Sequence, residues 1–206
     1  MREELGLRLL GLARGPIALA SKSPRRRELL GRLEVPHFCV DVDVLEGDLE
    51  PGEAPEDYVV RLSRRKLAAA RSAAEEGGAY VVLAADTVVA LGQRNLEKAA
   101  DAAEAEAFLR LLSGRSHQCI TGLAVRAPDG RISARTVLAR VKFKRLTDQE
   151  IAAYVASGEW QGKAGGYGIQ GLAGAFITGI NGSYTAIVGL PLYETKSLLE
   201  GMGWRG

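Results

Sequence analysis

The sequence predicts an α/β protein built on a mixed, twisted β-sheet. Short apolar segments of strand length alternate with helical segments along the 206 residues. Asp129-Gly130 and Asn181-Gly182 stand between apolar segments and are typical of hairpin turns, so a sheet of parallel strands alone is not expected. Hydrophobic residues make up 47% of the chain, which is enough for a large core and argues against intrinsic disorder.

The first half of the chain is expected to alternate strands with helices. Ser23 and Pro24 are residue types preferred at a helix N-cap and at the first helical position, and Pro55 opens a second helix. The predicted order is a buried strand at 16–20, a helix at 24–33, a strand with one wet face at 37–44, a helix from Pro55 to Gly77-Gly78, and two apolar half-strands within 79–91 that are separated by Ala85-Asp86-Thr87.

The second half contains a helix start that is easily recognised. Thr147 and Glu150 have the spacing of a capping box. The predicted order is an Ala-rich helix at 100–112, strands at 118–126 and 132–143, a helix from the capping box to Gly158, two strands within 175–188, and a last helix from Pro191.

Composition narrows the classes of function. The formal net charge is +2, from 27 basic and 25 acidic residues, which is less basic than a typical nucleic-acid binder. No apolar run approaches the ~20 residues of a membrane span, and residues 1–15 lack the apolar core of a secretory signal. Cys39 and Cys119 provide neither a disulfide framework nor a multi-cysteine zinc site. We therefore expect a cytoplasmic protein without nucleic-acid or membrane partners.

The charged residues are segregated along the sequence. Residues 36–57 hold eight acidic residues and no Lys or Arg, whereas residues 61–71 hold five basic residues and no acid. Most of these side chains are compatible with two solvated faces. A few of them could instead face a cleft.

Residues 19–30, LASKSPRRRELL, join the end of a strand to the start of a helix. The free N–H groups of a first helical turn favour an anion, and Arg25 and Arg26 add planar donors that suit phosphate. The sequence has no GxxxxGK[ST] motif, so a P-loop nucleotide hydrolase is not expected. The segment indicates either an anion site or a capped surface helix with basic side chains.

Two polar residues stand beside apolar segments in the middle of the chain. A carboxylate such as Asp86, placed between apolar half-strands, ligates a cation, accepts a proton or caps a turn. Lys98 follows Leu96-Glu97 and precedes the Ala-rich helix, where a solvated side chain is the alternative to a site residue. Sequence spacing alone leaves these roles open.

Residues 162–171, GKAGGYGIQG, hold five glycines, which would let the backbone approach a ligand closely. Gln170 offers both a donor and an acceptor and could read the edge of a planar heterocycle. The alternative is a mobile surface loop. His37 and His117 are too few for a zinc site, and Ser23 has no nearby His–Asp pattern for nucleophilic catalysis.

Taken together, these segments resemble the Maf family of nucleoside triphosphate pyrophosphatases. The matching pieces include LASKSPRRRELL at 19–30, YVVRLSRRKLAAA at 58–70, AADTVVAL at 84–91 and KAGGYGIQG at 163–171. The resemblance covers about residues 16–200. It implies one catalytic domain at 16–206 after an extension at 1–15, two lobes flanking a deep cleft as in inosine-triphosphatase-like proteins, and a homodimer.

The resemblance also implies a reaction and the residues that perform it. A nucleoside triphosphate would be hydrolysed to the monophosphate and pyrophosphate with a divalent cation, either Mg²⁺, Mn²⁺ or Co²⁺. Asp86 corresponds to the general base or to a metal ligand, and Glu46 to a second metal ligand. The implied catalytic residues are Asp86, Lys66 and Lys98, and the implied substrate-binding residues are Ser23, Arg25, Arg26, Thr87 and Gln170.

Within the family, the sequence is similar to the dTTP/UTP pyrophosphatase branch. That branch carries SPRR, ADT and YGIQG, which all stand here. The 7-methyl-GTP branch has Trp in place of Arg25, Gln in place of Thr87 and an acidic residue near Gln170. The resemblance therefore implies a pyrimidine base, with these three residues as the specificity positions.

The sequence departs from the family pattern at two site positions. Ala99 follows Lys98 where the family usually has Pro, which loosens the backbone there. Arg65 precedes Lys66 where Glu is common, which makes that patch more basic.

Three other functions compete with this interpretation. One is a pyrophosphatase for modified or non-canonical nucleotides, purines included. Another is a non-catalytic, nucleotide-binding regulator of cell division, which would not need to keep Asp86, Lys66 and Lys98 together. The third is a nucleic-acid binder that uses residues 61–71, but the acidic residues at 36–57 would repel a phosphate backbone.

Overall fold

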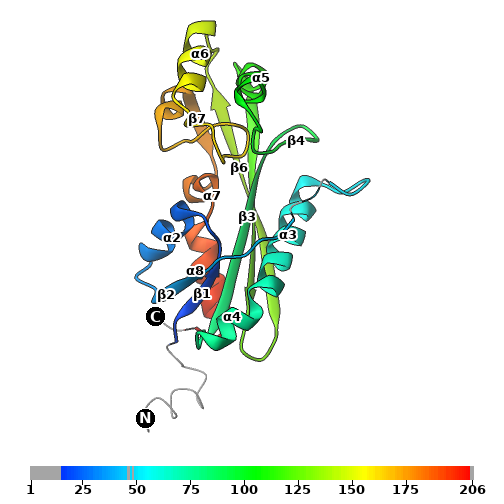
Figure 1. The fold of residues 1–206 in the computed structure, drawn as a ribbon, viewed down its shortest axis with the longest axis vertical. Helices are drawn as coiled ribbons and strands as arrows, with labels where there is room; N and C mark the ends of the chain where they lie inside the picture. The colour runs from blue at the N-terminus through cyan, green and yellow to red at the C-terminus, as the bar shows by residue number, and fades with distance from the viewer. Residues whose placement is uncertain (1–14, 46, 48, 205–206) are drawn as a thin grey trace.

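The computed structural model describes residues 15–45, 47 and 49–204, and these form the predicted α/β fold (Figure 1). The N-terminal extension, apart from Gly15, and the predicted metal ligand Glu46 lie outside the described residues. No helix in the described part is long and apolar enough to cross a membrane.

The sheet of the described residues has seven strands and is mixed, as predicted. Its order is β2-β1-β3-β5-β6-β7, with β4 paired to β3. β1 is parallel to β2 and β3, and the other pairs are antiparallel. The strands are β1 (Ile17–Ala20), β2 (His37–Val40), β3 (Val81–Leu91), β4 (Arg94–Leu96), β5 (Ser116–Arg126), β6 (Ile132–Phe143) and β7 (Ile177–Asn181).

The first lobe has helices on both faces of the sheet (Figure 1). One face of β1 and β3 directs Leu19 and Leu83 against α2 (Pro24–Gly31), α7 (Tyr184–Val188) and α8 (Leu192–Gly201). The opposite face directs Ala18 and Ala84 against α3 (Pro55–Ala69) and α4 (Arg71–Glu76). Apolar residues fill both faces because adjacent side chains of a strand point to opposite sides.

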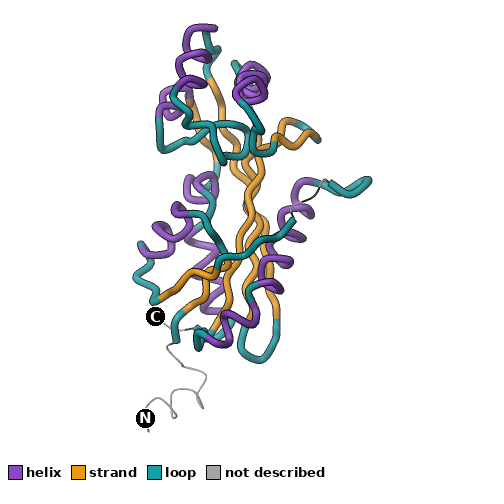
Figure 2. The backbone as a smooth tube through the Cα atoms, in the orientation of Figure 1, coloured by secondary structure: helices purple, strands orange, loops and turns teal. Residues whose placement is uncertain are grey.

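The second lobe forms around the far ends of the long strands. Here α5 (Ala102–Leu112), α6 (Asp148–Ala156) and the 3₁₀ helix η1 (Leu172–Phe176) enclose a separate cluster that includes Phe108, Phe143 and Tyr154. Figure 2 shows that β3, β5 and β6 run through both lobes. The two lobes are therefore joined by continuous strands.

Most predicted elements are confirmed, including the capping box of α6 and the β5–β6 hairpin, but four details of the prediction are wrong. β3 is one strand rather than two half-strands, because Asp86 pairs in register with Gly122 and needs no break. β2 ends at Val40, since its partner β1 ends at Ala20. The helix from Pro55 is divided into α3 and α4 at Ala70.

The fourth error concerns the segment after Asn181-Gly182. The sequence predicts a second strand there, but the chain forms α7. Ser183 stands at its N-cap, where the hydroxyl accepts a hydrogen bond of 3.2 Å from the backbone N–H of Ala186. The short strand β4 is not predicted from the sequence at all.

The edge of β3 beside β1 has a gap that positions the site. β1 pairs with residues 81–84 of β3, and β4 pairs with residues 89–91. Among the described strands, none pairs with residues 85–88 on this edge. Asp86 and Thr87 stand in this gap, beside the turn from β1 into α2.

Candidate active site

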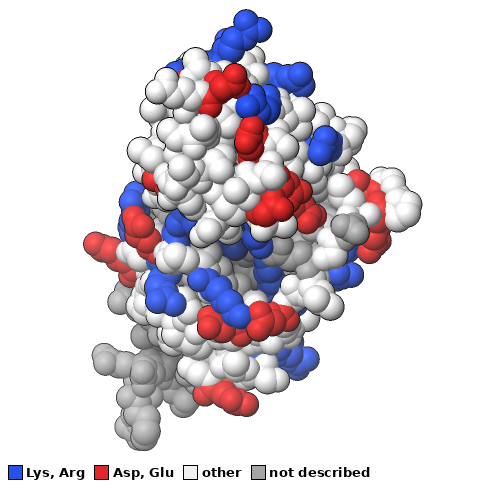
Figure 3. All heavy atoms as spheres, turned by 45° about the horizontal axis from the view of Figure 1, so that its top comes forward, with Lys and Arg blue, Asp and Glu red and all other residues white. Residues whose placement is uncertain are grey.

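A cavity of about 680 Å³ opens between the two lobes, at the gap in the edge of β3. Figure 3 shows a hollow there with lysine and arginine atoms inside it and acidic side chains nearby. Eight predicted site residues line the cavity: Ser23, Arg25, Arg26, Lys66, Asp86, Thr87, Lys98 and Gln170. The predicted cleft is therefore present, and it brings together segments that are far apart in sequence.

The turn from β1 into α2 supplies one wall. Ser23 is at the N-cap position of α2, as predicted, but its side chain makes no cap hydrogen bond. Its backbone N–H instead donates to the hydroxyl of Ser21 at 3.1 Å. Pro24 occupies the first helical position, as predicted, but the side-chain cap that the sequence predicts for Ser23 does not form.

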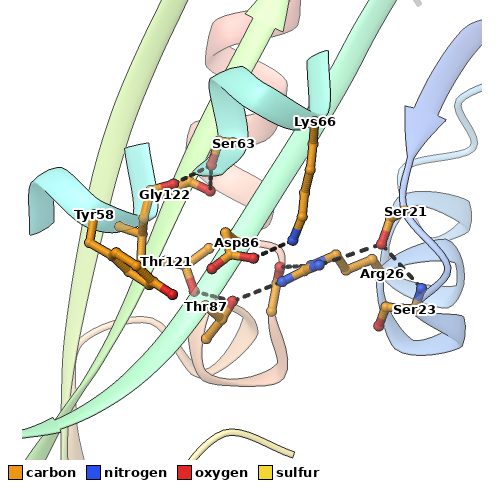
Figure 4. A network of polar contacts seen from close by, with 12 residues as sticks. Ser21, Ser23, Arg26, Tyr58, Ser63, Lys66, Asp86, Thr87, Thr121 and Gly122 are labelled. Atoms are coloured by element: carbon orange, nitrogen blue, oxygen red, sulfur yellow. Dashed lines mark hydrogen bonds and ion pairs between the residues drawn. The ribbon is translucent and has the colours of Figure 1, made fainter. Parts of the chain in front are cut away.

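The guanidinium of Arg26 is held in a fixed orientation (Figure 4). Its Nε donates to the backbone carbonyl of Gly189 at 2.8 Å. One terminal nitrogen donates to the hydroxyl of Thr87 at 3.2 Å, and the other to that of Ser21 at 3.4 Å. Gly189 has a φ of 123°, a conformation that disfavours residues other than glycine. This planar group is therefore fixed before any ligand binds.

Asp86 and Lys66 form a buried ion pair on the α3 side of the cavity (Figure 4). The Lys66 ammonium donates to Oδ1 of Asp86, and the two side chains are only 11% and 8% exposed. A carboxylate that is nearly excluded from solvent requires such a partner. The pair fixes both charges within the cavity.

A close contact between α3 and β5 brings Lys66 to this place. Gly122 of β5 lies opposite Asp86, and a Cβ on Gly122 would be 2.5 Å from the carbonyl oxygen of Val59. Ser63, one turn before Lys66, places its hydroxyl 2.6 Å from the carbonyl of Val59 and 2.9 Å from that of Gly122. The absence of a side chain at position 122 lets α3 lie directly on the sheet.

Lys98 reaches the cavity from the segment between β4 and α5. Its backbone forms an isolated antiparallel bridge with Ala164 of the Gly-rich loop. The N–H of Gly165 lies within 3.0 Å of the carbonyls of both Leu96 and Glu97. These bonds hold the backbone beside Ala99, and Lys98 lines the cavity.

The Gly-rich loop, residues 162–171, is anchored rather than free. Gly168 donates through its N–H to the hydroxyl of Tyr154 at 3.0 Å, and the Tyr167 hydroxyl is 2.7 Å from Nε2 of His117. Lys163 donates to the backbone carbonyl of Glu159. The exposed side chain of Gln170 is carried on this anchored loop.

Burial and charge alter the pKa values of groups around the loop. Burial lowers the pKa of Lys163, and the nearby Arg25 guanidinium lowers it further. Burial lowers the pKa of His117 to about 4 and raises that of Cys119 to about 11. His117 and Cys119 are therefore neutral near pH 7, and they are not a charged catalytic pair.

The described part of the cavity is rich in cations and poor in metal ligands. Six basic side chains line it, and four carboxylates do, namely Asp43, Asp86, Glu97 and Glu159. The described residues contain no group of three or more His, Cys, Asp or Glu that could hold a metal alone. This donor set fits a hard cation held by one or two carboxylates with phosphate oxygens and waters. Asp86 is one of the carboxylates that line the cavity.

Several cavity residues are not singled out by the sequence analysis. Lys22 extends from the β1–α2 turn and pairs with Asp43 at 2.6 Å, which raises the pKa of Lys22. Tyr58 lies near Glu97 across the cavity, with 3.5 Å between its hydroxyl and the carboxylate. Lys22 could have been found from the sequence, because it stands next to the predicted site residue Ser23. Tyr58 resembles any apolar residue of α3 in sequence.

Proteins with related sequences and structures are known. A protein named dTTP/UTP pyrophosphatase from Hyphomonas neptunium is 66% identical over 92% of this chain and 97% of its own. A protein of the same name from Caulobacter vibrioides is 52% identical over 94% and 100%. The solved nucleoside-triphosphatase / dITP/XTP pyrophosphatase from Mycobacterium abscessus has 20% identity and a TM-score of 0.38, over 64% of this chain and 75% of that one.

The sequence also matches a family as a whole. The model of the Maf-like protein family matches residues 16–202. This range includes the described residues that line the cavity. The chain therefore belongs to the family of Maf-like proteins.

Proposed function

We propose that this protein is a nucleoside triphosphate pyrophosphatase that hydrolyses dTTP and UTP to the monophosphate and pyrophosphate. The observation that carries the proposal is the convergence of a buried Asp86–Lys66 pair with Lys98, Arg25 and Arg26 in one cavity. Relatives with the name dTTP/UTP pyrophosphatase, at up to 66% identity, support the choice of substrate.

Triphosphate binding would depend on the basic wall of the cavity. A nucleoside triphosphate carries about four negative charges. Cationic side chains in a partly enclosed cavity attract these charges more strongly than the same side chains would in open solvent. Arg26 is fixed in advance by Gly189, Thr87 and Ser21, so little orientational freedom would be lost on binding. Arg25 and the N–H groups of the first turn of α2 lie on the same wall.

In the proposed reaction, water cleaves the phosphoanhydride bond between the α and β phosphates. Lys66 holds Oδ1 of Asp86, and Oδ2 would take the proton from the attacking water. The leaving pyrophosphate carries away the bonding electron pair, and Lys98 would stabilise the negative charge that develops on it. These roles agree with the positions of the three side chains on the cavity wall.

A divalent cation, Mg²⁺, Mn²⁺ or Co²⁺, is part of the proposal. As the alternative to its role as the general base, Asp86 would hold the cation together with the substrate phosphates, and Glu46, which lies outside the described residues, is the candidate for a second ligand. When bound, the cation would neutralise phosphate charge. Dialysis against a chelator should abolish pyrophosphate release, and each added cation should restore it to a different degree.

The pyrimidine preference would arise where the Gly-rich loop faces α2. Arg25, Thr87 and Gln170 line the same cavity, although they come from three separate segments. The amide of Gln170 can donate to a carbonyl of uracil or thymine and accept from its N3–H. Both bases present these groups, which is consistent with the paired substrates.

We further propose a homodimer that works in the reducing cytoplasm. Cys39 and Cys119 are free thiols, as a reducing compartment allows. Light scattering of the purified chain should give twice the mass of 22.0 kDa. A mass of one chain over a range of concentrations would contradict the dimer.

The decisive experiment is a panel of nucleoside triphosphates with Mg²⁺ or Mn²⁺, assayed for pyrophosphate release. Selective cleavage of dTTP and UTP is expected. Cleavage of purine or modified nucleotides instead would keep the reaction but overturn the substrate assignment. Binding of nucleotides without cleavage, by a folded protein, would favour the non-catalytic regulator.

A further inference from the structure

Thr121 is a polar residue that lies behind the cavity. It is fully buried in β5 and does not line the cavity itself. Its register partner is Thr87 of β3, so the two side chains lie on the same face of the sheet, with their hydroxyl oxygens 2.8 Å apart. Figure 4 shows this pair beside the guanidinium of Arg26.

The carbonyl of Ala186 fixes the direction of the Thr121 hydroxyl. Ala186 is in the last turn of α7, where a helix leaves its carbonyls without intrahelical donors. In a longer helix, the N–H of Leu190 would donate to the Ala186 carbonyl. Here it donates instead to the backbone carbonyl of Thr185 at 2.9 Å. The Thr121 hydroxyl lies 2.8 Å from the Ala186 oxygen. Since a carbonyl only accepts, Thr121 uses its single hydrogen there.

This direction determines what Thr87 can do. With its hydrogen on Ala186, Thr121 can only accept from Thr87, so Thr87 uses its own single hydrogen on Thr121. A lone pair of Thr87 then accepts from the Arg26 guanidinium at 3.2 Å. The hydrogen bonds therefore run in one direction, from Arg26 through Thr87 and Thr121 to Ala186.

We propose that Thr121 is a positioning residue for Arg26 that acts through Thr87. Thr87 has no hydrogen left to donate to a base, so we assign it to orienting the arginine that faces the triphosphate, in place of the part in the pyrimidine preference considered above, which leaves Arg25 and Gln170 for base recognition. The nature of the residue at position 87 would thus determine where the guanidinium meets the phosphates. This inference rests on the proposed function, because it assigns phosphate binding to Arg26.

The test compares two substitutions of the buried hydroxyl. Thr121→Val has nearly the same shape but no donor or acceptor, whereas Thr121→Ser keeps both. We expect Thr121→Val to lower kcat/KM by about tenfold or more for dTTP, UTP and purine triphosphates alike, and Thr121→Ser to restore most of that loss. Thr178→Val, the same substitution on β7 and outside the cavity, should behave as wild type.

A probe without a base separates orientation of Arg26 from base recognition. Calorimetry would measure the affinity for inorganic tripolyphosphate without a divalent cation. We expect Thr121→Val to weaken it about as much as it lowers kcat/KM. An altered nucleotide ranking with unchanged tripolyphosphate affinity would mean that Thr87 reads the base, which would overturn the proposal. Wild-type kinetics in a folded Thr121→Val protein would overturn it as well.

Two further measurements keep the test decisive. If Thr121→Val does not fold, Thr87→Val and Thr87→Ser test the same chain of hydrogen bonds at Thr87, which is partly exposed. If both valine variants fold, the double variant should lose little more kcat/KM than either single variant, since both interrupt one chain of hydrogen bonds. Additive losses would contradict this chain. Tripolyphosphate binding that depends on Thr121 in a protein without pyrophosphatase activity would contradict the proposed function alone.

Discussion

Asp86 and Thr87 are adjacent in β3 and therefore face opposite sides of the sheet. Asp86 faces α3 and pairs with Lys66, whereas Thr87 faces α7 and accepts from Arg26. The gap between β1 and β4 exposes both faces of the strand to one cavity. In the proposed mechanism, these two neighbouring residues would supply a proton acceptor and a support for phosphate binding.

Asp86→Asn should lower turnover at least about tenfold, which corresponds to about 1.4 kcal/mol of activation free energy. The amide keeps the shape of the carboxylate but is a poor proton acceptor, and it removes the charge that pairs with Lys66. Steady-state pyrophosphate release from dTTP would measure the effect.

The matched control for this variant is Asp148→Asn. It makes the same chemical change at an 86% exposed side chain of α6, outside the cavity. This control should retain wild-type turnover. A folded Asp86→Asn protein with wild-type turnover would remove Asp86 from the mechanism.

Gln170→Glu should weaken the preference for dTTP and UTP more than it weakens triphosphate binding. An ionised carboxylate cannot donate to a base carbonyl, so the side chain would lose half of its hydrogen-bonding capacity. The kcat/KM ratios across the nucleotide panel measure the preference. Gln161→Glu adds the same charge outside the cavity and should leave the ranking unchanged, and an unchanged ranking for Gln170→Glu would refute its role.

The packing of α3 on β5 depends on the absence of a side chain at position 122. Gly122→Ala should lower the free energy of unfolding by about 1–3 kcal/mol, because its Cβ would approach the backbone of Val59 to 2.5 Å. The helix must move away, and Lys66 moves with it, so turnover should fall as well. Urea unfolding and pyrophosphate release would measure the two effects.

Gly179→Ala on β7 is the matched control for this substitution. A Cβ there would meet no heavy atom of the described residues within 4 Å. The control should therefore change stability by less than about 0.5 kcal/mol. Equal stability of the two alanine variants would show that α3 does not need the glycine.

The regular elements were predictable from local sequence because they depend on local chemistry. The capping box at Thr147 and the turn at Asp129-Gly130 specify a helix start and a hairpin within a few residues. The error at α7 has the same origin, since its apolar residues suit a strand and only Ser183 indicates a cap. β4 is too short, at three residues, to show a pattern.

The site was predictable in its parts, but its long-range contacts were not. The resemblance to a family named Asp86, Lys66, Lys98 and the arginines, and the fold brings them to one cavity. Thr121 could not be found in this way, because a threonine within an apolar strand looks like any β-branched residue. Its role depends on Ala186, which is 65 residues away in the chain.

The stability of the protein should depend on pH through His117. Burial lowers its pKa to about 4, whereas an unfolded histidine has a pKa near 6.5. Between these values the unfolded chain binds more protons, so stability falls as the pH falls. From pH 7 to pH 5 we expect a loss of roughly 2 kcal/mol from this residue, measured by urea unfolding.

His117→Gln isolates this contribution. Glutamine does not titrate, so the free energy of unfolding of the variant should lack the fall between pH 7 and pH 5 that His117 causes in the wild type. The acids whose pKa values are lowered by ion pairs, such as Glu53 and Glu150, act at lower pH and are common to both proteins. Parallel stability curves would contradict the assignment to His117.

The strands that run unbroken through both lobes also constrain how the protein can move. Asp86 and Thr87 lie partway along β3, between the segment paired with β1 and the segment paired with β4. A hinge between the lobes would have to bend β3 and β5 together, and their paired hydrogen bonds resist this. The two lobes are therefore expected to keep their relative orientation when a nucleotide binds, so the cavity around Asp86 would already be formed before the substrate arrives.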